Sequence, residues 1–123
     1  IGPLRRAVQL SHGAALIQII LGQALVASNN PANSDEAISI LRAALAREPE
    51  AAIGYAQLAM AYGRKGERSQ ADLAAAQAAL MRGDYKTARL LATRAKTLFP
   101  VGSPGWVKSD DILSVKEPKS GPN

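Results

Sequence analysis

The chain has 123 residues, a formal net charge of +5 at pH 7, one histidine and no cysteine. This length suits a single domain of about 100–200 residues, and a hydrophobic content of 47% is too high for a disordered chain. Lack of cysteine excludes a disulfide scaffold, a thiolate metal site and a cysteine nucleophile, and one histidine excludes a site that needs two imidazoles. The alanine-rich composition, with 4% aromatic residues, favours an all-α fold.

In chain order, apolar spacing and breaker residues predict a series of helices. Ser34 has the side chain of an N-cap and is followed by Asp35 and Glu36, which suit the first turn of a helix. Ser103 with Pro104 predicts another helix start, and residues 63–67 predict a turn. The expected helices cover residues 4–11, 14–28, 34–47, 51–64, 68–82, 85–98 and 104–113.

A spacing of small and large apolar residues recurs along the chain. The pattern A-x3-L-x2-A-x4-P begins at Ala37 and ends at Pro49, and a copy with alanine in the leucine place runs from Ala88 to Pro100. A third copy ends at Gly83, which lies 34 residues after Pro49. An internal period of this length is typical of repeat proteins built from helix pairs.

The pattern predicts how the helices pack, because residues three and four apart share one face of a helix. Small residues should lie where two helices approach closely, so a Gly22→Leu change should overpack its contact. We expect the following residues to pack the repeats together: Gly22, Ala37, Leu58, Ala59, Tyr62, Ala71, Ala88 and Trp106. Gly83 and Pro100 are 17 residues apart, which is half a repeat, so irregular stacking is expected around residues 68–82.

A second pattern follows the breakers. Tyr55 and Tyr62 occupy the first and last places of the motif W-x2-L-G-x2-Y after Pro49, and Trp106 follows Pro100 at the offset of Tyr55. Residues 4–112 therefore resemble the tetratricopeptide repeat. The resemblance implies a solenoid of about six or seven antiparallel helices, paired in hairpins.

On this basis the chain divides into three parts. Residues 1–12 are expected to be the remnant second helix of a truncated upstream repeat, 13–113 the repeat domain with a terminal capping helix, and 114–123 a disordered tail. The chain starts at Ile1 without a methionine, and we expect it to be a piece of a longer protein.

A more specific run of residues is found mainly in the C-terminal half. It consists of Gly63-Arg64-Lys65-Gly66, Ala71-Asp72-Leu73-Ala74, Gly83-Asp84-Tyr85, Phe99-Pro100, Gly102-Ser103-Pro104-Gly105-Trp106 and Asp110-Asp111-Ile112-Leu113. This run is similar to the C-terminal tetratricopeptide region of bacterial envelope zinc metallopeptidases of peptidase family M forty-eight. The resemblance implies a periplasmic or cell-envelope location and a parent protein whose zinc ion and HExxH motif lie upstream. This chain contains no HExxH, so we expect no catalytic residue, metal ligand or cofactor in it.

The resemblance also implies a concave groove, lined by the first helix of each pair, in which an extended or helical segment of a partner docks. By spacing, the expected groove residues are Leu16, Ile19, Gln23, Val26, Ala27, Ile53, Ala56, Met60, Gly63 and Arg64. Ordinary helix packing, or burial against a protease domain, is the alternative for these positions. The lysine and asparagine clamp of co-chaperone members has no match among them.

A cationic face is expected on and beside the helix at 85–98. Its residues are Arg82, Lys86, Arg89 and Lys96. The face suits an acidic protein, phospholipid headgroups or nucleic acid, or it is a solvated outer surface. No aromatic residues alternate with these cations for base stacking, so no specific nucleic-acid partner is expected.

The sequence therefore predicts a non-catalytic protein-interaction scaffold. Its expected partner is a protein or peptide client, or the protease domain of the parent metallopeptidase. The alternative is a free-standing tetratricopeptide scaffold or co-chaperone unrelated to proteolysis. The apolar run at 14–27 contains glutamine and glycine and is shorter than the roughly 18–20 residues of a membrane span, so no transmembrane segment is expected.

Overall fold

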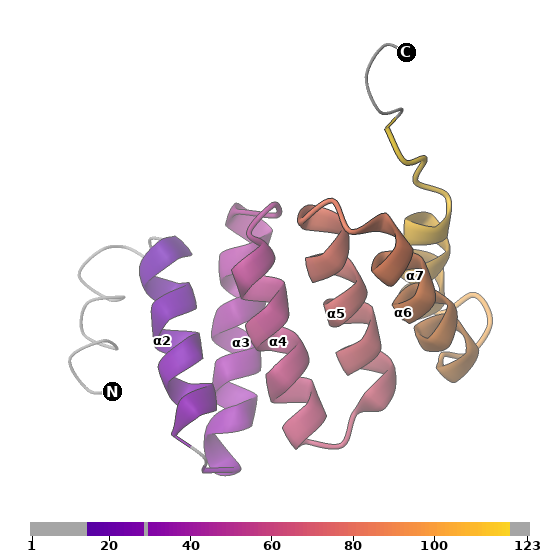
Figure 1. Cartoon of the computed structure of the whole chain (residues 1–123). Helices are drawn as coiled ribbons and strands as arrows, with labels where there is room; N and C mark the ends of the chain where they lie inside the picture. The colour runs from indigo at the N-terminus through magenta and orange to yellow at the C-terminus, as the bar shows by residue number, and fades with distance from the viewer. Residues whose placement is uncertain (1–14, 29, 119–123) are drawn as a thin grey trace.

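The computed structural model describes residues 15–28 and 30–118, and this part of the chain is all-α without strands. Its helices are α2 (Ala15–Ala27), α3 (Ala32–Arg47), α4 (Ala52–Arg64), α5 (Arg68–Met81), α6 (Tyr85–Leu98) and α7 (Pro104–Leu113) (Figure 1). All six lie within two residues of the helices expected from the sequence. The expected helix at 4–11, the expected repeat remnant at 1–12 and His12 lie outside the described residues.

Successive helices run in opposite directions and are joined alternately at the two ends of the molecule (Figure 1). Each helix packs against the next one in the chain. The breakers act as expected at these joints, because Pro49 lies between α3 and α4, and Gly66 and Gly83 adopt φ values of 76° and 78° in the two following loops. None of the described helices combines the length and apolar character that a membrane span requires.

Side chains of Asp84 and Ser103 cap the starts of α6 and α7, whereas α3, α4 and α5 begin without a side-chain hydrogen bond at the N-cap. At α7 the hydroxyl of Ser103 accepts from the backbone N–H of Trp106 at 3.4 Å, as the sequence predicted. The predicted N-cap at Ser34 is wrong, because α3 begins two residues earlier and Ser34 is buried inside its first turn. The side chain of Asn30 accepts from the N–H of Ala32 at 3.0 Å and so supports the earlier start.

Close helix contacts occur where the sequence places small residues. A Cβ atom on Gly22 would lie 2.6 Å from the side chain of Leu41, so α2 and α3 approach too closely for any other residue without rearrangement. Most of the residues expected to pack the repeats are buried, namely Gly22, Ala37, Leu58, Tyr62 and Ala88. Ala59 and Ala71 are partly buried against the same core, and Trp106 is partly buried in α7.

The buried residues form two clusters that meet at α5. The first joins α2, α3 and α4 and includes Ala74 of α5. The second joins α5, α6 and α7 and includes Leu73, Ala76 and Ala79 of α5. Thus α5 packs in both directions, which its run of alanines permits because neighbouring helices can approach it on several sides.

The stacking pattern changes at this helix. Besides the contacts between successive helices, α2 contacts α4 and α5 contacts α7. Within the described part of the chain, α4 makes no such contact with α6, although a uniform stack of hairpins would bring them together. This irregularity agrees with the half-repeat spacing between Gly83 and Pro100.

Candidate functional site

Between the described helices, open clefts lie beside α4 and α6 and beside α3 and α7. The α4–α6 cleft, of about 260 Å³, has the alanines Ala75, Ala78 and Ala79 of α5 as its floor. Residues of α4 and α6 form its walls. The α3–α7 cleft, of about 350 Å³, lies between α3 and α7 over residues of α4 and α5. Both clefts exist because α5 separates pairs of helices that do not touch, α4 from α6 and α3 from α7.

The predicted groove residues of α4 lie at and beside the α4–α6 cleft. Ala56 lines the cleft, and Ile53 and Met60, three and four residues away on the same helix face, are each 49% exposed. Gly63 and Arg64 are exposed at the end of α4. This helix therefore turns an apolar stripe outward next to the cleft.

The prediction for α2 is displaced by about one residue. Leu16 is 68% exposed, and Gln23 and Ala27 are also exposed. Ile19 and Val26, however, are 4% and 2% exposed and belong to the first core cluster, so they do not line an open groove. The outward face includes Ile20 instead, a residue that the sequence analysis missed and that is 43% exposed.

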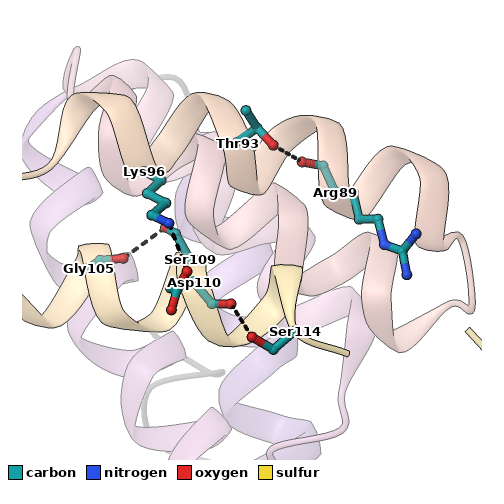
Figure 2. Close-up of polar contacts among 7 residues, drawn as sticks. All are labelled: Arg89, Thr93, Lys96, Gly105, Ser109, Asp110 and Ser114. Carbon is teal, nitrogen blue, oxygen red and sulfur yellow. Dashed lines mark hydrogen bonds and ion pairs between the residues drawn. The ribbon is translucent and has the colours of Figure 1, made fainter. Parts of the chain in front are cut away.

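Two residues of the predicted cationic face form contacts within the molecule. Lys96 forms an ion pair with Asp110 of α7 at 2.8 Å (Figure 2), and its ammonium nitrogen lies 4.6 Å from the centre of the Trp106 ring. Arg89 donates to the backbone carbonyl of Val115 at 3.1 Å. These contacts attach α7 and the start of the predicted tail to α6, so they do not leave a continuous cationic surface.

The remaining members of that face are separated from one another. Lys86 is exposed on α6, whereas Arg82 lies at the end of α5 and lines the α4–α6 cleft together with Asp84 and Thr87. Arg94, a further cation of α6, pairs with the buried Asp72 of α5 at 2.9 Å. A broad binding surface for phosphates is therefore not assembled by these side chains.

The run around Trp106 has a structural role in the turn between α6 and α7. Gly102 has a φ of 81°, which favours glycine. Gly105 is buried against the ring of Phe99, and a Cβ atom there would collide with that ring. The hydroxyl of the buried Ser109 donates to the carbonyl of Gly105 at 2.8 Å (Figure 2). These residues set the sharp return of α7 onto α6.

The pKa values of Tyr55 and Lys65 are shifted from their ordinary values. Partial burial raises the pKa of the Tyr55 hydroxyl, which lines the α3–α7 cleft. The pKa of Lys65 is raised by its hydrogen bond to Asp35, at 2.6 Å, which links the loop after α4 to the start of α3. Within residues 15–28 and 30–118, no group of three or more His, Asp or Glu side chains is arranged to hold a metal ion.

Comparisons of the chain with protein-family models, with curated proteins and with solved structures find no match.

Proposed function

We propose that this chain is a protein-interaction scaffold of the tetratricopeptide type, and that a partner segment docks on the α4–α6 cleft. The observation that carries the proposal is the stripe formed by the exposed Ile53 and Met60 and the half-buried Ala56 beside an alanine floor. Exposed apolar side chains beside a cleft are typical of sites that bind another protein.

The shape of the cleft suits a helical or extended segment. Its floor of alanines lets a partner backbone approach closely, while Met60 adapts to varied side chains because its chain is unbranched and polarizable. Arg82, Asp84 and Thr87 supply polar groups at the other wall, which can orient the segment. The scaffold thus offers apolar contact area together with a few directional groups.

We further propose that the chain is the C-terminal region of a zinc metallopeptidase of the bacterial envelope. The support is the resemblance of residues 63–113 described above. In this proposal the zinc ion and the catalytic residues belong to the parent protein outside this chain, and the scaffold docks clients or the protease domain.

The coding sequence upstream of this chain tests the proposal. An HExxH motif within roughly the length of one or two domains is expected, whereas further helical repeats alone would favour a free-standing scaffold.

Substitution of the stripe tests the docking proposal. The tagged full-length protein carrying Ile53→Glu and Met60→Glu is compared with a variant carrying Val101→Glu and Val107→Glu. All four side chains are exposed, and the second pair lies outside both clefts. We expect the first variant to lose at least one protein that co-purifies with the unsubstituted protein. The second variant should retain it. An unchanged set of co-purifying proteins in the first variant would contradict the proposal.

A further inference from the structure

The α3–α7 cleft lies on the other side of α4 from the proposed docking stripe. Tyr55, Leu58 and Tyr62 line this cleft, whereas Ile53, Ala56 and Met60 point roughly half a turn away around the helix. Helix α5 likewise contributes Gln70, Leu73, Ala74 and Gln77 here and a different set of alanines to the α4–α6 cleft. The two clefts are therefore separate surfaces.

The floor of the α3–α7 cleft is apolar and largely preformed. Leu58, Leu73 and Ala74 are buried members of the two core clusters, so their positions are fixed by packing. The cleft is open to solvent and is shallower than a pocket that encloses most of a small molecule. It can take one or two apolar side chains of a longer ligand.

The rim of the cleft carries positive charge. Arg42 comes from α3 and Lys108 from α7, while Gln70 and Gln77 of α5 add amide groups. No described residue that lines the cleft is acidic, and neither Arg42 nor Lys108 forms an ion pair within residues 15–28 and 30–118. This differs from Arg94 and Lys96 on α6, which each pair with an aspartate.

We propose that the α3–α7 cleft is a second docking site, which binds an acidic peptide segment carrying an apolar side chain. The apolar side chain lies over Leu58 and Leu73, and carboxylates on either side of it meet Arg42 and Lys108. The tyrosine hydroxyl of Tyr55 and the amide of Gln77 are available to hydrogen-bond the peptide backbone. The choice of an acidic peptide follows from charge complementarity, since cations are unpaired at both walls.

A labelled peptide tests the proposal directly. The probe is a short fluorescein-labelled peptide in which glutamates flank a Leu-Phe pair, measured by anisotropy with the full chain at about 0.15 M salt, where distant charges are screened. We expect saturable binding. Replacing the glutamates by glutamine, or the Leu-Phe pair by serines, should each weaken binding by about tenfold. Absence of saturable binding would overturn the proposal.

Paired charge reversals locate the site. Arg42→Glu with Lys108→Glu should weaken binding of the acidic peptide by about tenfold or more, because attraction at the rim becomes repulsion. Lys86→Glu with Lys116→Glu causes the same change of net charge at exposed positions outside the cleft, and should change binding by less than about twofold. Equal losses in the two variants would show attraction by net charge alone and would overturn the proposal.

Two further readouts separate this site from the other surface. Amide and tyrosine signals of Tyr55 and Tyr62 should shift in nuclear magnetic resonance spectra when the peptide binds. Ile53→Glu with Met60→Glu also lowers the net charge, at positions outside this cleft, and should change peptide affinity by less than about twofold, so this test does not depend on the proposed client docking. Chemical-shift changes confined to α6 would overturn the proposal. A dimer of this chain detected by sedimentation, with its interface at this cleft, would also overturn it.

Discussion

The two halves of the helical scaffold bury different kinds of side chains between their helices. In the first, α2, α3 and α4 bury large aliphatic side chains, and Leu21, Leu25 and Leu41 are almost completely enclosed. In the second, α5, α6 and α7 meet mainly through alanines such as Ala76 and Ala92, with fewer large residues. Hydrophobic stabilisation grows with the apolar area that is removed from water. The first half, with its larger buried side chains, therefore gains more stabilisation per contact.

The second half compensates with polar contacts between helices. Arg94 binds Asp72 across α5 and α6, and Lys96 binds Asp110 across α6 and α7. Close alanine contacts bring the helix backbones near one another but specify their relative positions weakly. Directional ion pairs at both contacts supply that specification, so α6 is positioned by charge as well as by shape.

Truncation of a large core residue should have the greatest effect. Leu41→Ala removes a fully buried side chain that packs against Gly22, and should cost about 2–5 kcal/mol of unfolding free energy. Leu90→Ala on α6 is the control, since Leu90 is 62% exposed and its loss should cost less than about 0.5 kcal/mol. Urea denaturation measures both. A cost below about 1 kcal/mol for Leu41→Ala would remove the contrast between the two cores.

Enlargement of a small residue should harm both halves. Ala92→Leu in the second core and Gly22→Leu in the first should each cost about 1–3 kcal/mol, because Ala92 is completely buried and a Cβ at Gly22 would already collide with Leu41. Gly63→Ala is the matched control, since no atom lies within 4 Å of a Cβ placed there. That variant should keep or raise stability by up to about 1 kcal/mol in thermal unfolding. Tolerance of Ala92→Leu would mean that the alanine core is loosely packed.

Removal of an interhelical ion pair should have a smaller effect. Asp110→Asn takes the carboxylate from Lys96 and should cost less than about 1 kcal/mol, with the difference shrinking as salt is added. The single Trp106 lies under Lys96, so its fluorescence should report the change at this contact. Asp111→Asn, on the exposed side of α7, is the control and should leave the emission unaltered. Identical emission changes in both variants would argue against a specific role for the pair.

Alkaline pH should produce the smallest and most gradual effect. Folding raises the pKa of both Tyr55 and Lys65, so the folded state holds these protons more tightly than the unfolded state. The associated stability is present below the ordinary pKa values near 10 and is lost as pH rises above them. Tyr55→Phe should reduce the decline measured by denaturation between neutral and strongly alkaline pH. If the stability of the Tyr55→Phe variant falls with pH as steeply as that of the unsubstituted protein, Tyr55 does not contribute to the pH dependence.

The helix positions could be predicted because their signals are local. Proline and glycine breakers and the recurring small residues mark each helix, and the half-repeat spacing anticipates the change of stacking at α5. The exposed face of α2 was harder to predict. This helix is apolar on nearly every side, so spacing alone did not distinguish the buried Ile19 from the exposed Ile20.

The site residues depend more strongly on tertiary structure. The partners of Lys96 and Arg94 lie on other helices, 14 and 22 residues away in the sequence. No local sequence pattern predicts these ion pairs. The α3–α7 cleft likewise requires the placement of four helices before Arg42 and Lys108 appear as its two walls. The spacing of the tetratricopeptide pattern placed Ile53, Ala56 and Met60 of α4 on one face, and Ile53 and Met60 are exposed in the structure.

Photo-crosslinking from position 60 in the full-length protein is the most direct test of the docking proposal. The photoreactive residue replaces Met60 beside the α4–α6 cleft, and a second protein carries it at Val101 in the α6–α7 turn. We expect a discrete covalent adduct with a client or with another region of the parent protein from position 60 and none from position 101. The same adducts from both positions, or none from position 60, would contradict the assignment of this face as the docking surface.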